Sequence, residues 1–147
     1  MKKVLYIFAL KKIVFMTLKA LNIWNVLKIV IALFMIFAGV QHFINANFFI
    51  PYVPSFLPLK MTIIYVSGLF EILVGLFLFT KKYASYGAIG ALVLLLLFLP
   101  IHIWDVITET PAIGSKQAAL IRLPIQFLLI FIVWKIKKSI SQNKSAL

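Results

Sequence analysis

One carboxyl in this chain lies where a charged group is costly. Glu71 falls near the middle of residues 61–79, a run that is otherwise almost wholly apolar, and it is one of three acidic residues against fifteen Lys and Arg. An ionisable side chain at bilayer depth usually faces a bundle interior or a wet cavity and marks a functional site by default. Inserting the charged acid costs roughly 2.5 to 3.5 kcal/mol, and keeping a Glu neutral at pH 7 against a reference pKa of about 4.3 costs roughly 3.7 kcal/mol. Because these costs are so similar, the neighbours of Glu71 decide its charge.

Other polar side chains occur in the apolar runs at spacings that put them on common helix faces. Residues 102 and 105 are three apart, and residues 122 and 126 are four apart, so each pair can face inward together. Gly68 and Gly75 lie on the same face as Glu71, so the acid points at another helix. The candidates for a polar core or a ligand site, which together describe a funnel open to the outside, are Glu71, Arg122, Gln126, His42, His102 and Asp105.

Plainer interpretations of the same residues stay open. Arg122 can simply neutralise Glu71 or Asp105 in a structural ion pair, and we expect it to be coupled to Glu71 directly or through Gln126 or water. The two histidines can sit at the interface without any ligand. Haem between two imidazoles would need them about 4 Å apart across an iron, from metal–nitrogen distances near 2 Å, and the sequence gives no support for this geometry. No metal site is predicted. The faces formed by small residues, Gly68 and Gly75 in the second span and Ala84, Gly87, Ala88 and Ala91 in the third, are typical of helix packing.

Composition identifies the class of protein. The chain is 64% hydrophobic with a mean hydropathy of +1.11, far more apolar than a soluble domain of 147 residues. We expect an all-α integral membrane protein, an antiparallel bundle of four transmembrane helices, because four runs approach the 20 residues that span a bilayer. The expected spans are residues 23–43, 61–79, 83–104 and 118–136. The absence of cysteine excludes thiol and disulfide chemistry within this chain.

Charge predicts the orientation of these spans. Twelve of the fifteen Lys and Arg precede or begin the first span, separate the second from the third, or end or follow the fourth. The positive-inside rule then places both termini in the cytoplasm. We therefore predict a basic N-terminal segment (1–22), a four-helix membrane domain (23–136) and a basic tail (137–147), attracted to anionic headgroups and not to nucleic acid. Translation from Met16 is an alternative start for the N-terminal segment.

Prolines shape the outer half of the predicted bundle. Residues 44–59 carry three prolines among four aromatic residues, and we expect this loop to lie over the outer mouth as a lid. Pro100 removes a helix donor and frees the carbonyl of Leu96, and Pro124 does the same for Leu120. Freed carbonyls at depth need polar neighbours or water, which again favours a polar interior in the outer half.

Several of these segments together are similar to the DoxX-like family of bacterial four-helix membrane proteins. The resemblance covers about residues 29–136, and its recognisable pieces are AGVQHF at 38–43, the proline-rich loop at 51–58, YVSGLFE at 65–71, LPIH at 99–102 and RLPIQ at 122–126. It implies that Glu71 is the family's intramembrane acid and that Arg122 and Gln126 are its fourth-helix polar pair. Relatives include a subunit of an archaeal thiosulfate:quinone oxidoreductase and proteins linked to membrane redox stress complexes.

Two functions follow as hypotheses for a multi-pass protein of the bacterial cytoplasmic membrane. In the first, the chain is an accessory, quinone-linked component of a membrane redox assembly, not an enzyme on its own. Gln126, His102 and Arg122 would donate hydrogen bonds to quinone carbonyls, and Glu71 would be a proton-exchanging acid. In the second, it is a membrane interaction or assembly protein that binds a lipid-like amphiphile, a partner helix or a second copy of itself. A transporter ranks third, because inverted repeats are not visible.

Overall fold

The computed structural model describes residues 6, 7, 11 and 23–145, and all of its regular structure is helical. Its long helices are α2 (Ile23–Ile44), α4 (Lys60–Phe79), α5 (Ala84–Ile107) and α6 (Lys116–Ser145), and two short turns, α3 (Ala46–Phe49) and η1 (Ile50–Tyr52), follow α2. Apart from three residues, the expected basic segment 1–22, with the alternative start at Met16, lies outside the described residues.

Each of the four long helices is apolar and long enough to cross a membrane. This agrees with the expected class of protein, because an α-helix pairs most of its backbone groups within one segment and its apolar side chains suit a hydrocarbon layer. α2, α4 and α5 begin and end within three residues of the expected spans. α6 differs, since it continues from the expected end at 136 to Ser145 and so carries most of the basic tail as helix.

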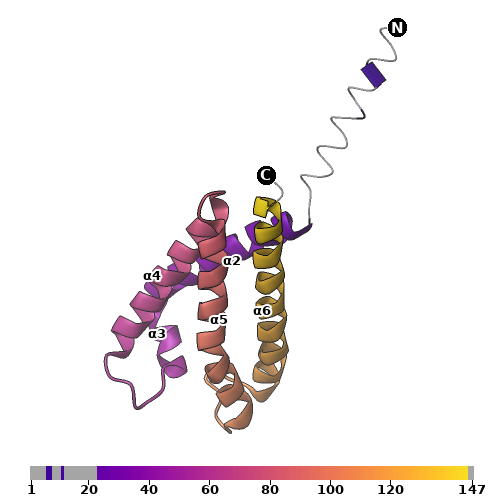
Figure 1. Ribbon diagram of the computed structural model, residues 1–147. Helices are drawn as coiled ribbons and strands as arrows, with labels where there is room; N and C mark the ends of the chain where they lie inside the picture. Colours follow the sequence, from indigo (N-terminus) through magenta and orange to yellow (C-terminus); the bar gives the residue numbers. More distant parts are fainter. Residues whose placement is uncertain (1–5, 8–10, 12–22, 146–147) are drawn as a thin grey trace.

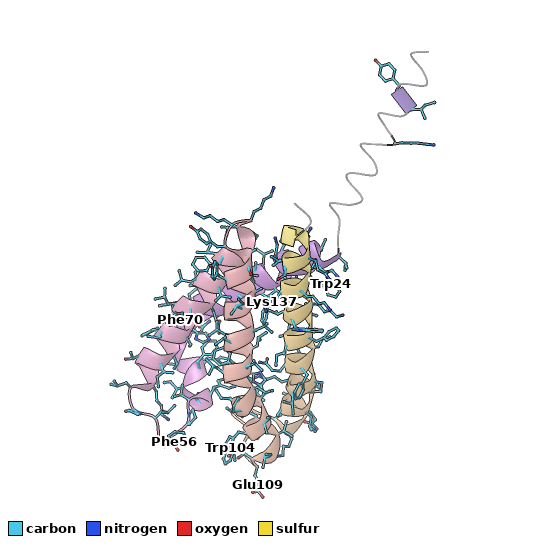
Figure 2. The ribbon with its side chains drawn as sticks, viewed as in Figure 1. Trp24, Phe56, Phe70, Trp104, Glu109 and Lys137 are labelled. Carbon is cyan, nitrogen blue, oxygen red and sulfur yellow. The ribbon has the colours of Figure 1, made fainter. Side chains whose placement is uncertain are left out.

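Successive long helices run in opposite directions (Figure 1). The starts of α2 and α5 and the ends of α4 and α6 gather at one end, which we call the lysine end. The connections 45–59 and 108–115 gather at the other, the loop end. Trp24 and Lys137 lie near the lysine end, and Phe56, Trp104 and Glu109 near the loop end (Figure 2).

The helices pack as two pairs joined by a hairpin. α2 lies along α4, α5 lies along α6, and the short connection 80–83 joins α4 to α5. Apolar side chains from all four helices fill the centre, among them Met35, Leu78, Leu95 and Val133. On α5 the predicted small-residue face is buried, and a Cβ on Gly87 would lie 2.7 Å from the backbone nitrogen of Leu78. Small residues therefore set the spacing between α4 and α5.

The proline-rich loop folds against the loop end of α4. Ala46 and Val53 pack on Ile64, and all three are buried. Phe48, Phe49 and Tyr52 form a run of ring contacts above the helix ends. Phe56 stays 81% exposed, so the part of the loop that covers the bundle is residues 46–53.

Candidate functional site

The six predicted polar residues do not meet in one funnel. Five of them form two groups, one between α2 and α4 and one between α5 and α6. His42, His102, Asp105 and Arg122 lie nearer the loop end, and Glu71 lies near the middle of α4. The first, which we call the Glu71 cluster, consists of His42, Ser67 and Glu71. The second, the Arg122 cluster, consists of His102, Asp105 and Arg122 together with Tyr52 from the loop.

Glycines bring the helices of the Glu71 cluster close together. A Cβ on Gly39 would lie 2.5 Å from the Gly68 carbonyl oxygen, and a Cβ on Gly68 would lie 2.5 Å from the Cβ of His42. A third glycine, Gly75, is equally tight against the Ala32 carbonyl and the Ile36 side chain. The prediction that the glycine face of Glu71 points at another helix is confirmed, and that helix is α2.

Within the Glu71 cluster the imidazole is held on one side by α4. His42 Nδ1 lies 2.9 Å from the Ile64 carbonyl oxygen and 3.0 Å from Ser67 Oγ, and the Ser67 hydroxyl donates to the same carbonyl at 2.9 Å. On the other side, His42 Nε2 lies 3.9 Å from Glu71 Oε1. Glu71 Oε2 is buried and has no hydrogen-bond partner within the described residues. The carboxyl thus has one titratable neighbour and one unsatisfied oxygen.

The loop closes the Glu71 cluster from the loop end. The rings of Phe49 and His42 lie 4.0 Å apart between centroids, at an angle of 39°. His42 and Glu71 are 8% and 4% exposed, so both are screened from the surroundings. Sequence reasoning did not identify Phe49 or Ser67 as parts of the site. For Ser67 a signal exists, because it lies four residues before Glu71 on the same helix face.

In the Arg122 cluster an ion pair joins α5 to α6. Arg122 Nη1 lies 3.0 Å from Asp105 Oδ2, and Asp105 Oδ1 accepts the Ala112 backbone N–H at 2.9 Å. The Tyr52 ring lies over the guanidinium at 4.7 Å. Burial raises the pKa of the Tyr52 phenol, with Arg122 opposing the rise and Asp105 adding to it. Through Phe49 and Tyr52, whose rings are 6.3 Å apart, one loop covers both clusters.

Two predicted donors are already engaged within the protein. His102 Nδ1 donates to the Phe98 carbonyl at 2.8 Å, and Gln126 Nε2 donates to the Leu95 carbonyl at 2.6 Å. We expected the carbonyl freed by Pro100, that of Leu96, to need a partner. Leu95 accepts instead because it is buried towards the core, whereas the side chain of Leu96 is 52% exposed.

Of the two ion pairs expected for Arg122, the one with Asp105 is present, and the direct pairing with Glu71 is wrong. Within the described residues Arg122 pairs with Asp105, and Glu71 faces His42. Counting residues along a helix gives the depth of a side chain but not the neighbouring helix that it faces. The two clusters differ in which helices their side chains face. Among the described residues, no group of three His, Asp or Glu side chains lies close enough together to hold a metal ion.

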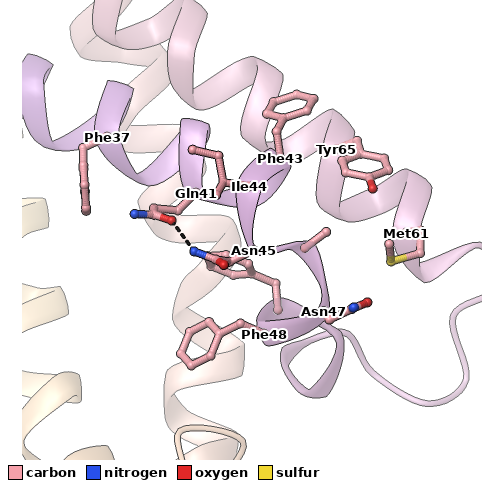
Figure 3. Close-up of a pocket in the computed structure, with 11 residues that line it drawn as sticks. Phe37, Gln41, Phe43, Ile44, Asn45, Asn47, Phe48, Met61 and Tyr65 are labelled. Atoms are coloured by element: carbon pink, nitrogen blue, oxygen red, sulfur yellow. Dashed lines mark hydrogen bonds between the residues drawn. The ribbon is translucent and has the colours of Figure 1, made fainter.

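A hollow of about 650 Å³ opens beside the Glu71 cluster, at the junction of α2, α3 and α4 (Figure 3). Aromatic rings and three carboxamides line it, and Gln41 Oε1 accepts a hydrogen bond from Asn45 Nδ2 at 2.7 Å. Phe43 and Tyr65, both in its lining, stack on each other with ring centroids 5.5 Å apart. Phe49 belongs both to its lining and to the cover of His42. The lining residues central to its chemistry are Phe37, Gln41, Asn45, Asn47, Phe48 and Tyr65.

Comparison with known proteins gives a family but no activity. The model of a family described as "Domain of unknown function (DUF8561)" matches residues 31–137, which is more than two thirds of the chain and includes both clusters. No curated protein and no solved structure matches.

Proposed function

This chain belongs to the DUF8561 family, and we propose that it is a membrane protein that binds a lipid-like amphiphile in the hollow at its loop end. In this proposal it is a multi-pass protein of the bacterial cytoplasmic membrane and does no chemistry on its own. The hollow carries the proposal. It combines apolar rings with carboxamides at the end of a membrane-length helix, where the polar and apolar parts of an amphiphile separate.

The distribution of charge supports a cytoplasmic lysine end. Among the described residues, Lys28, Lys81, Lys82, Lys135, Lys137 and Lys138 belong to that end, whereas the loop end has Lys60, Lys116 and Arg122. The positive-inside rule then orients the lysine end, where the four-helix domain both begins and finishes, towards the cytoplasm. Lysines near the surface also attract anionic headgroups by about 1 kcal/mol each. The hollow accordingly faces the outer leaflet.

Three features of the hollow suit an amphiphile with a carbonyl-bearing polar end. Carboxamides donate and accept hydrogen bonds, so Gln41, Asn45 and Asn47 can meet ester, amide or quinone carbonyls. The side chains of Phe37, Phe43 and Phe48 are between 47% and 63% exposed and offer an apolar wall for a chain or ring. Interfacial depth is where such aromatic residues are favoured.

A quinone is the second candidate, and the DoxX-like resemblance favours it. Its expected donors, His102, Arg122 and Gln126, already donate to protein acceptors, so a quinone would find its donors at the carboxamides of the hollow. There the chain would hold the quinone for a membrane redox partner. A phospholipid and a quinone share the chemistry that the hollow recognises, namely carbonyl oxygens on an apolar body.

Mass spectrometry of lipids that copurify with the protein in mild detergent tests the proposal. We expect one class, phospholipid or quinone, to be enriched over the bulk membrane extract, and a Gln41→Leu and Asn45→Leu double variant to retain about tenfold less of it. That figure follows from one or two lost hydrogen bonds of about 1 kcal/mol each. Gln117→Leu, at an exposed carboxamide of α6, is the matched control. Equal retention by the double variant and the control would contradict the proposal.

A further inference from the structure

We propose that Glu71 and His42 form one proton-binding site, which holds a single proton between the carboxyl and the imidazole and exchanges it past Phe49. The site shares its cover, Phe49, with the hollow, but neither Glu71 nor His42 lines that hollow, so the inference does not depend on the proposed function. It stands on the tautomer of His42, on the unsatisfied oxygen of Glu71, and on the cover that Phe49 provides.

The hydrogen bonds of His42 fix its tautomer. A carbonyl oxygen only accepts, so the 2.9 Å contact with Ile64 requires a proton on Nδ1. The hydroxyl of Ser67 gives its own proton to the same carbonyl, which leaves its lone pairs towards Nδ1. In the neutral imidazole Nε2 is therefore the bare nitrogen, and it is the atom that faces Glu71.

The surroundings of Glu71 favour a neutral carboxyl. An ionised carboxylate would need donors at both oxygens, and Oε2 has none within the described residues. A buried carboxylate oxygen without a hydrogen bond costs more free energy than a buried carbonyl oxygen without one. A proton on Oε1 points the acid's donor at Nε2 of His42 and leaves Oε2 as the carbonyl oxygen. The 3.9 Å between these two atoms exceeds hydrogen-bond length, so a small side-chain rotation completes the contact.

Among the residues that the structure describes, no charged group other than His42 compensates Glu71. α2 brings His42, and its lysine, Lys28, is near the lysine end. α5 and α6 bring His102, Asp105 and Arg122, which are engaged with Phe98 and with one another. Within the described residues the ion-pair partner of Glu71 is therefore His42 alone.

The Glu71–His42 pair has no net charge when it holds one exchangeable proton. Transfer from Oε1 to Nε2 converts acid and imidazole into carboxylate and imidazolium, and the sum of charges stays zero. Removing the proton leaves an anion facing a nitrogen lone pair, and adding a second leaves an unpaired cation, both in an apolar setting where charge is costly. The pair therefore behaves as one titrating unit and not as two residues.

Access to this site is restricted to the loop end. Beside Glu71, α2 and α4 touch backbone to backbone at Gly39 and Gly68, which leaves no room between the helices there. At the loop end the cover is the Phe49 ring on the imidazole. Proton exchange with water thus requires Phe49 to move.

The composition of the chain makes the test direct, because it has two glutamates, Glu71 and Glu109, and two histidines. With carboxyl-¹³C glutamate, infrared or NMR spectra of reconstituted protein at neutral pH should show one protonated and one ionised carboxyl. The exposed Glu109 should account for the ionised signal, so in the Glu109→Gln variant only the protonated carboxyl signal should remain. With ¹⁵N-histidine, one imidazole should show a proton on Nδ1 and a hydrogen-bonded, unprotonated Nε2. Two ionised carboxyls at neutral pH would overturn the proposal, and so would a protonated signal that His42→Leu leaves unshifted.

Exchange kinetics test the role of Phe49. We expect Phe49→Ala to speed deuterium exchange of the protonated carboxyl at least about tenfold, a loss of about 1.4 kcal/mol in the barrier. Phe48→Ala is the matched control, because that ring is 63% exposed and has no ring contact with His42 among the described residues. Equal rates in the two variants would remove Phe49 from the path. Both readouts use folded protein, and Glu109→Gln, at an exposed site, still assigns the protonated carboxyl to Glu71 if His42→Leu does not fold.

Discussion

Arg122 reaches across from α6 to Asp105 on α5, and that contact ties the two ends of the 108–115 connection together. Asp105 is 1% exposed and accepts from both the guanidinium and the Ala112 backbone, so it anchors the helix ends and the loop between them. Lys116 adds to this connection by donating to the carbonyls of Val106 and Thr108 at the end of α5.

Breaking this ion pair should be costly. Asp105→Asn leaves the guanidinium without its counter-ion, and removing one partner of a buried pair costs 3–5 kcal/mol. Because the Arg122 side chain is 27% exposed, we expect about 3 kcal/mol in thermal unfolding in detergent. A double-mutant cycle of Asp105→Asn with Arg122→Leu should show coupling of about 1–3 kcal/mol. In a second cycle, Glu71→Gln combined with Arg122→Leu, the two losses of stability should be additive. Coupling in that cycle would mean that Arg122 also interacts with Glu71.

The close contact of α2 with α4 should not tolerate a methyl group at Gly68. Its Cβ would meet His42 Cβ at 2.5 Å and the Gly39 carbonyl at 2.8 Å, so Gly68→Ala should destabilise by about 1–3 kcal/mol as the helices separate. Gly90→Ala is the matched control, because its closest neighbour is a Val74 methyl at 2.6 Å, the end of a side chain that can rotate. Comparable melting temperatures for the two variants would argue against the contact.

Tyr52 should ionise only at high pH. Because burial raises its pKa, the protonated phenol is favoured in the folded protein. This stabilisation is present below the ordinary tyrosine pKa of about 10 and is lost as the pH rises through the higher folded-state value. The measurement is the alkaline absorbance titration of wild type minus that of Tyr52→Phe. A difference curve centred at or below about 10 would show that the phenol is not buried over Arg122.

Topology can be tested with single cysteines, since the chain has none of its own. Cysteines at Ser55 and Ser115, in the two connections of the loop end, should react with an impermeant thiol reagent in intact cells. A cysteine at Lys82, in the exposed turn between α4 and α5, should react only after permeabilisation. Labelling of position 82 in intact cells would reverse the orientation that the lysines predict.

Sequence reasoning succeeded where a single property decides the outcome. Length and apolarity are enough to identify four membrane-length helices, and the small residues of α5 are enough to identify a buried face. It also recognised that Glu71 points at a neighbouring helix, because Gly68 and Gly75 flank it on one face. These are properties of one helix at a time.

Sequence reasoning could not decide which helix supplies the partner of each charged side chain. Glu71 and Arg122 are the conspicuous opposite charges of the second and fourth spans, yet each finds a partner elsewhere, His42 and Asp105 respectively. Which helices pair depends on the tightest backbone contacts, here at Gly39 and Gly68, and these need both helices to be in place. Phe49 escaped notice for a similar reason, since its role depends on how the loop folds back over His42.

The length of α6 has a consequence for the membranes that this protein fits. From Lys116 to Lys137 the helix rises through 21 residues, or about 32 Å, close to the 30 Å or so of a typical hydrocarbon layer. A thicker bilayer would draw one of these ammonium groups towards oil, and a thinner one would tilt the helix, each at fractions of a kcal/mol per ångström. The spacing of Lys116 and Lys137 on α6 therefore favours bilayers whose hydrocarbon thickness matches the distance between these two lysines.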